Sequence, residues 1–159
     1  MLEKFFTVTM QNHPISTAIR DSVWVYAFDQ VFHLIALAVF AGAILMVDLR
    51  LLGGGLKDRP VAQVARDAQP WLIGAFLVLV VTGVVQMMTN ATKEYFSPIF
   101  WFKMYVLVPA IIFTFTIRWK VASAAEGRVG PLWSKTVGLV SIALWSTVAV
   151  SARLIGLLS

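Results

Sequence analysis

Apolar residues occur along this chain in four long runs that are separated by shorter polar stretches. The runs cover residues 23–47, 71–88, 98–117 and 136–158. A helix needs about 20 consecutive apolar residues to cross the hydrocarbon core of a bilayer, and each run is close to that length. The pattern predicts an all-α integral membrane bundle of four transmembrane helices, which forms a single transmembrane domain over residues 1–159.

A shorter amphipathic stretch precedes the first run. Phe5, Phe6 and Met10 stand among polar neighbours, which is typical of a helix that lies in the membrane interface. We therefore expect an N-terminal interfacial helix. A second such piece is expected over residues 14–22, with Ser22 as the N-cap of the first spanning helix.

The composition agrees with a membrane protein and excludes several chemistries. Hydrophobic residues make up 59% of the 159 residues and charged residues 13%, about half the charged fraction of a soluble domain. The mean hydropathy is +0.82. The chain has no cysteine, so disulfides, thiolate metal sites and cysteine nucleophiles are excluded.

Basic residues predict how the bundle is oriented. Cytoplasmic loops of membrane proteins are enriched in Lys and Arg, so both long loops are expected in the cytoplasm and both termini in the periplasm of a bacterium. The net charge of +5 follows from this bias, and the expected partner is the lipid bilayer, with no nucleic acid. Eight basic residues lie in the two long loops (Arg50, Lys57, Arg59, Arg66, Arg118, Lys120, Arg128, Lys135), against Lys4, Arg20 and Lys93 on the other side.

Five polar residues fall in one layer in the outer half of the predicted bundle, and they form the candidate site. Asp29 and His33 share a face of the first helix because residues four apart stack. Ionisable groups are costly inside a membrane and usually mark a functional site. The layer consists of Asp29, His33, Gln86, Lys103 and Arg153.

His33 is the candidate metal ligand of this layer, because it is the only histidine in the four runs. Neutral imidazole is the usual protein ligand of haem iron. If haem b bound there, Arg153 and Lys103 would suit its propionates, and Asp29 could hold the other ring nitrogen of His33.

The second axial ligand of such a haem is open. Met87, Met88 or Met104 could supply it, since Met/His ligation occurs in cytochromes, although methionines are more often packing residues. Two copies of His33 could instead share one haem across a two-fold axis.

Two other ligands suit the same layer. A quinone carbonyl could accept a hydrogen bond from His33 or Lys103, with Trp101, Phe102 and Trp145 as walls. Histidine with methionine can also bind Cu(I), but no Met-x-x-Met motif supports copper.

A purely structural role is the alternative. Asp29 could pair with Lys103 or Arg153, and His33 could donate to a backbone carbonyl, because polar groups in membranes often find internal partners.

The end of the first run carries a second polar cluster, Asp48 and Arg50, where the helix is expected to meet the cytoplasm. We interpret both residues as contributing to topology and packing, by capping the helix or pairing with the next loop, with Gly53 allowing the turn. The inner half of the spans is otherwise expected to be almost free of polar groups. Ala38 and Gly42 form a small-residue pair for close helix approach, either within the bundle or in a dimer.

Several stretches carry a family resemblance. They are Asp29-x-x-x-His33, Ala41-Gly-Ala43, Asp48-Leu-Arg-Leu-Leu-Gly53, Ser97-Pro-Ile-Phe-Trp-Phe-Lys103, and Trp145 with Ala152-Arg153-Leu-Ile-Gly156. Together they resemble a family of small four-helix inner-membrane proteins of bacteria classed as a domain of unknown function, although that family usually has glycine at the position of Ala152. The resemblance implies the four-helix topology and no established activity. A more distant likeness is to copper-resistance membrane proteins and cytochrome b561-like bundles, at the level of the fold.

These observations predict a small inner-membrane redox protein that binds haem b or quinone through His33 and passes electrons to a membrane or periplasmic redox partner. A homo-oligomer is compatible with this prediction. The alternatives are a non-catalytic accessory or assembly subunit of a membrane complex, and a carrier of a small solute or copper. The absence of an inverted repeat argues against a carrier.

Overall fold

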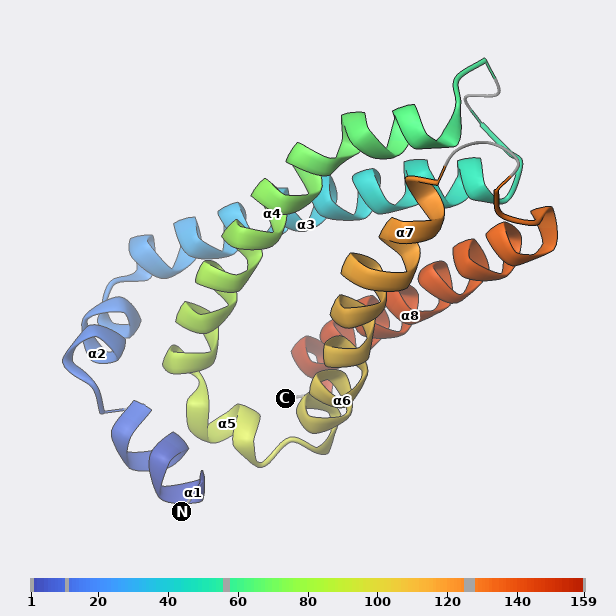
Figure 1. Ribbon diagram of the computed structural model, residues 1–159. Helices are drawn as coiled ribbons and strands as arrows, with labels where there is room; N and C mark the ends of the chain where they lie inside the picture. Colours follow the sequence, from blue (N-terminus) through green and yellow to red (C-terminus); the bar gives the residue numbers. More distant parts are fainter. Residues whose placement is uncertain (1, 11, 56–57, 125–127, 159) are drawn as a thin grey trace.

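The protein is a bundle of four long helices in a computed structural model that describes residues 2–10, 12–55, 58–124 and 128–158 (Figure 1). The first two long helices are α3 (Val23–Leu51) and α4 (Val61–Thr89), and the fourth is α8 (Pro131–Leu158). The third is continuous through α6 (Pro98–Phe113), a π-helical turn η2 (Thr114–Arg118) and α7 (Trp119–Ala122). All four are long and apolar enough to cross a membrane, which confirms the predicted fold class.

The helices extend further than the apolar runs. α4 begins at Val61 rather than at residue 71, and α8 begins at Pro131 rather than at residue 136. The first turns of α4 include Arg66 and Asp67, which are exposed. Backbone hydrogen bonding continues past the membrane surface, so hydropathy marks the embedded part of a helix and not its ends.

Short helices cover the end of the bundle that holds both termini (Figure 1). They are α1 (Leu2–Lys4), η1 (Phe5–Met10), α2 (Pro14–Asp21) and α5 (Ala91–Tyr95). Phe6 of η1 is buried, with its ring centroid 5.4 Å from that of Tyr95. Ser16 Oγ of α2 donates to the carbonyl of Met88 at 2.8 Å. The N-terminal segment therefore packs on the connection between α4 and α6.

Ser22 caps α3 as predicted. Its Oγ accepts a hydrogen bond from the backbone N–H of Val25 at 3.5 Å, which satisfies one of the free donors in the first turn.

The apolar core lies in the half of the bundle near the α3–α4 and α7–α8 connections. It includes Phe40, Val47 and Leu51 of α3, Leu72 of α4 and Val137 of α8. α3 packs along α4, α6 packs along α8, and α3 crosses α8. No residue of α3 before Ala36 is buried, so the other half of the bundle is more open.

Glycine allows α3 and α8 to cross closely. A Cβ atom at Gly138 would lie 3.1 Å from the carbonyl oxygen of Asp48 and 3.3 Å from Leu51 Cβ. The predicted small pair behaves differently, because Ala38 and Gly42 are exposed and a Cβ at Gly42 would meet nothing within 4 Å. The prediction that this pair packs within the bundle is therefore wrong. Its role in a dimer contact stays a prediction.

Candidate functional site

His33 is fixed by a hydroxyl group from the neighbouring helix. Its Nδ1 lies 2.7 Å from Thr82 Oγ1 on α4. The Thr82 oxygen lies 2.7 Å from the carbonyl of Val78, one turn earlier. A threonine hydroxyl has one hydrogen, and the Val78 carbonyl can only accept it. When the threonine hydroxyl donates to this carbonyl, His33 Nδ1 is the donor to Thr82 and Nε2 carries the lone pair.

The imidazole of His33 is half-buried, and its surroundings leave room beside the ring. Gly83 is the residue next to Thr82, and a Cβ there would lie 3.6 Å from His33 Cε1. Glycine thus keeps α4 from covering that edge of the imidazole.

Asp29 is joined to Gln86, also across the α3–α4 pair. Gln86 Nε2 donates to Asp29 Oδ2 at 3.1 Å. The expectation that Asp29 pairs with Lys103 or Arg153 is wrong in the described part of the chain, where neither ion pair forms. Asp29 also does not hold the second nitrogen of His33, since Thr82 occupies that position. Both differences follow from how α3 and α4 face one another.

Lys103 brings the third helix into the layer. Its ammonium is half-buried and interacts electrostatically with the imidazole of His33 and with the carboxylate of Glu94. Burial raises the pKa of Glu94 on α5 to about 7, and the positive charge of Lys103 opposes part of this rise. Sequence reasoning did not single out Glu94, because it lies in the short connection outside the runs.

Two of the predicted groups stand apart from these contacts. Arg153 is exposed on α8 and belongs to neither ion pair that the described residues form. Met87 and Met88 are half-buried near the end of α4. The structure therefore joins Asp29, Gln86 and His33 through α3 and α4, with Lys103 in electrostatic range and Arg153 outside.

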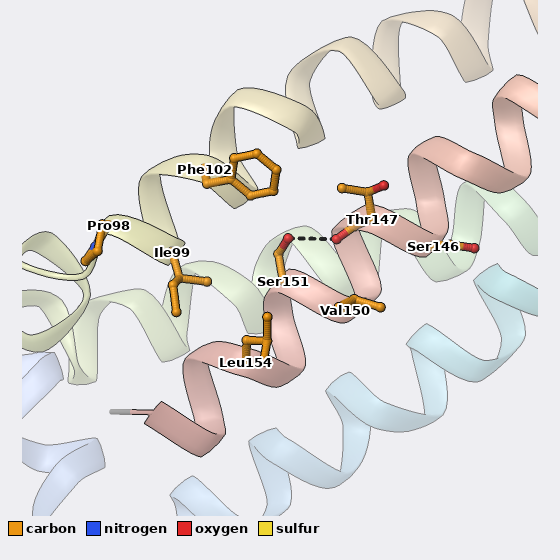
Figure 2. A pocket seen from close by; sticks show the side chains of 8 residues that line it. All are labelled: Pro98, Ile99, Phe102, Ser146, Thr147, Val150, Ser151 and Leu154. Atoms are coloured by element: carbon orange, nitrogen blue, oxygen red, sulfur yellow. Dashed lines mark hydrogen bonds between the residues drawn. The ribbon is translucent and has the colours of Figure 1, made fainter.

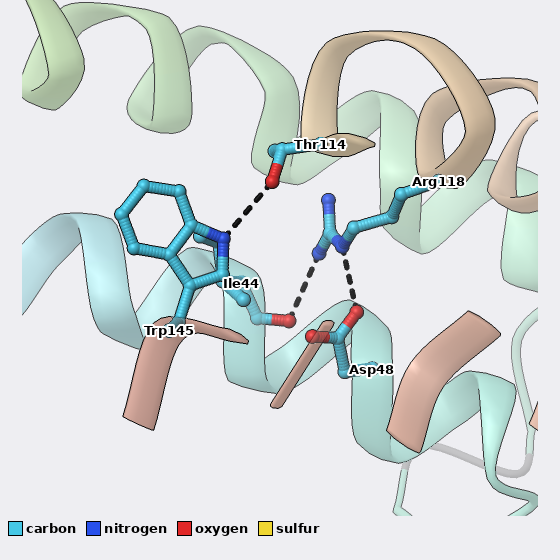
Figure 3. Close-up of polar contacts among 5 residues, drawn as sticks. All are labelled: Ile44, Asp48, Thr114, Arg118 and Trp145. Atoms are coloured by element: carbon cyan, nitrogen blue, oxygen red, sulfur yellow. Dashed lines mark hydrogen bonds and ion pairs between the residues drawn. The ribbon is translucent and has the colours of Figure 1, made fainter. Parts of the chain in front are cut away.

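A second polar site, which the sequence did not predict, lies in the half of the bundle near the α3–α4 and α7–α8 connections (Figure 3). Arg118 Nε lies 2.6 Å from Asp48 Oδ1, and the two side chains are 3% and 0% exposed. Arg118 Nη2 also donates to the carbonyl of Ile44 at 3.0 Å. The expectation that the inner half lacks such groups is wrong, and Arg118 is not a loop residue.

This ion pair corrects the interpretation of the Asp48–Arg50 cluster. Arg50 Nε donates to the carbonyl of Arg59 in the next loop at 2.9 Å, as predicted. Asp48 instead joins α3 to the third span. Asp48 follows Ile44 by four residues and precedes Leu51 by three, so it shares the buried face of α3. That register is the signal from which its burial could have been predicted.

Further polar groups surround the pair. Trp145 Nε1 of α8 donates to Thr114 Oγ1 at 2.9 Å (Figure 3), and its ring lies 4.7 Å from that of Phe40. Trp145 therefore packs in the core and does not form a wall of the outer layer. Asp48 Oδ2 and Ser141 Oγ are buried without a hydrogen bond of ordinary geometry, although the Ser141 side chain interacts with the Asp48 carboxylate.

Comparison with known proteins places the chain in a family. A model of a family of unknown function, DUF6644, matches residues 19–158, which include all four long helices and both polar sites. No curated protein and no solved structure matches the chain significantly. Because the match covers most of the sequence, the chain belongs to this family of unknown function.

Proposed function

We propose that this protein is a small redox protein of the bacterial inner membrane, and that its outer polar layer binds the head group of a quinol or quinone at His33. The observation that carries the proposal is the hydrogen bond between His33 Nδ1 and Thr82. With Nδ1 as the donor in this bond, Nε2 is an unprotonated acceptor on a half-buried ring.

An acceptor nitrogen suits the reduced form of the ligand. The O–H of a quinol can donate to His33 Nε2, and the imidazole can take that proton as a general base. In this transfer the quinol O–H bond breaks, an Nε2–H bond forms and the quinol oxygen keeps the electron pair. The oxidised quinone has only carbonyl acceptors at this position and would need a donor.

Charged neighbours would stabilise the products of this proton transfer. Lys103 supplies a positive charge for the quinol oxygen that has lost its proton, and its ammonium can donate to the carbonyl of the oxidised form. Asp29 interacts electrostatically with His33 and would stabilise the imidazolium cation. Electrons would then pass to a redox partner at the membrane or in the periplasm.

Haem b is the second candidate, and the same nitrogen favours it. Iron coordination also needs a neutral imidazole whose other nitrogen donates a hydrogen bond, and Thr82 provides this acceptor. Met87 or Met88 would supply the second axial position. Arg153 supports the haem proposal less, because it lies outside the contacts that join the layer.

We also propose the orientation that the charges favour. The α3–α4 and α7–α8 connections would face the cytoplasm, and both termini would face the periplasm. Because Arg118 is buried in an ion pair, it no longer counts as a loop charge, and seven of the eight inner cations remain against three. The layer at His33 would then lie in the periplasmic half.

The test compares ligand binding by purified full-length protein and two histidine variants. An absorption spectrum before and after dithionite reduction detects haem, and solvent extraction with chromatography detects copurified quinone. A short-chain benzoquinol is then titrated in detergent, with tryptophan fluorescence as the signal. We expect His33→Gln to abolish binding and Thr82→Val to weaken it, while His13→Gln at the N-cap of α2 binds like the wild type.

Each other outcome has a definite meaning. If the wild type shows a Soret band that His33→Gln removes, the ligand of this site is haem b and not quinol. Quinol binding that survives His33→Gln refutes the site. A colourless protein that binds no quinol and copurifies with another membrane subunit supports the accessory role, and bound copper on metal analysis supports the carrier.

A further inference from the structure

An open groove runs between α6 and α8. Its inner part has a volume of about 520 Å³ and is lined by Phe102 of α6 and by Val150 and Leu154 of α8, among others (Figure 2). A second hollow of about 530 Å³ shares Pro98 and Ile99 with the first. The two hollows adjoin at these residues and are together called here the α6–α8 groove; the second is also lined by Lys93 of α5.

Hydroxyl groups line the inner part of the groove, but most of the surface that they leave for a ligand is apolar. Ser151 Oγ donates to the carbonyl of Thr147 at 2.7 Å (Figure 2). Thr147 Oγ1 donates to the carbonyl of Ala143 at 2.8 Å. The hydroxyl protons of these two residues are already used within α8, so apart from the hydroxyl of Ser146 the surface offers mainly methyl groups, methylenes and the Phe102 ring. Such a surface fits a hydrocarbon chain.

The outer end of the groove carries positive charge. Lys93 of α5 lines it together with Phe96 and Ile155. Arg153 follows Ser146, a lining residue of the inner part, by seven residues, so it lies two turns further along the same side of α8. The described residues form two ion pairs, and neither Lys93 nor Arg153 belongs to them. Two uncompensated cations thus stand at the end of an apolar groove.

We propose that the α6–α8 groove binds one anionic phospholipid, with an acyl chain between the two helices and the phosphate at Lys93 and Arg153. Basic residues at a membrane surface attract anionic head groups, and Arg pairs well with phosphate. The groove shares no lining residue with the described contacts of His33, Asp29 and Gln86, and it contains Phe102, which the sequence suggested as a wall of the quinone site. The two sites can therefore be tested separately.

The first test measures head-group selectivity by native mass spectrometry of the full chain in detergent. The probes are dioleoyl phosphatidylglycerol and dioleoyl phosphatidylcholine, which have the same acyl chains. We expect the wild type to retain one phosphatidylglycerol in preference. The double variant Lys93→Gln/Arg153→Gln should bind it about tenfold more weakly or worse. The double variant Lys4→Gln/Arg20→Gln removes two exposed cations from the same end and should behave like the wild type.

The second test fills the groove. Val150→Trp places a large ring between α6 and α8 and should abolish retention of both lipids, while Val81→Trp on the exposed side of α4 should not. Circular dichroism and gel filtration establish that each variant folds, and if Val150→Trp does not, the charge variants decide alone. Equal binding of the two lipids by the wild type, or equal loss in both double charge variants, overturns the proposal.

Discussion

The buried ion pair between Asp48 and Arg118 should be the largest single polar contribution to the stability of the bundle. Removing one partner of a buried pair leaves an unpaired charge and costs about 3–5 kcal/mol. Arg118→Met also removes the hydrogen bond to the carbonyl of Ile44, which is worth about 1 kcal/mol. We therefore expect Arg118→Met to lower the free energy of unfolding by about 4–6 kcal/mol, and Asp48→Asn by about 3–5 kcal/mol.

The double variant Asp48→Asn/Arg118→Met measures the interaction energy between the two side chains, apart from what each contributes alone. It has no unpaired charge, so it should be less destabilised than Arg118→Met alone, with a coupling energy of about 2–3 kcal/mol. The free energy of unfolding is measured in mixed micelles with a rising fraction of sodium dodecyl sulfate, followed by circular dichroism and tryptophan fluorescence.

The exposed ion pair between Arg59 and Asp67 is the matched control. Its atoms are 3.6 Å apart and its side chains are 59% and 61% exposed, so Arg59→Met and Asp67→Asn should each change stability by about 1 kcal/mol or less. If the variants at Asp48 and Arg118 cost no more than these controls, or if their two costs simply add, the pair does not hold α3 to the third span.

Three further predictions concern packing, pH and hydrogen bonding, with the same unfolding assay. Gly138→Ala should lower the free energy of unfolding by about 1–3 kcal/mol, because it overpacks the α3–α8 crossing. Gly74→Ala, whose added Cβ meets nothing within 4 Å, should be neutral or stabilising. Equal effects of the two variants would contradict the close approach of α3 and α8. Because burial raises the pKa of Glu94 from 4.5 to about 7, the folded state holds this proton more tightly, so stability should fall as pH rises from about 4.5 to 7. Glu94→Gln should remove this dependence, and a wild type without it would show that Glu94 is not buried. Trp145→Phe should cost about 1 kcal/mol, with no further loss when Thr114→Val is added if the two share one hydrogen bond.

The fold was predictable because four apolar runs of this length have few stable structures other than membrane-spanning helices. The cap at Ser22 was predictable because its signal is local. The start of α4 at Val61 was not, since a helix that leaves the membrane keeps its hydrogen bonds while its side chains become polar. Hydropathy cannot report such an end.

The polar contacts were predictable only within one helix. The spacing of Asp29 and His33 places both on one face of α3, but their partners depend on how far α3 is rotated against α4. That rotation is set by side-chain packing along the whole interface, which no short pattern encodes. Arg118 was misplaced for a related reason: it follows an apolar run and precedes Trp119, as a residue at the membrane surface would.

The two polar sites differ in whether their charged groups remain available to a ligand, and this difference supports the proposed site at His33. In the half of the bundle near the α3–α4 and α7–α8 connections, Asp48 and Arg118 neutralise each other at 2.6 Å inside the apolar core, so neither charge can meet a ligand without breaking the pair. In the other half, the charge of Lys103 acts on His33 and Glu94 without forming an ion pair among the described residues. Groups that are held in place but not neutralised can still bind a ligand, which supports the proposed site at His33, whereas the buried pair of Asp48 and Arg118 stabilises the bundle.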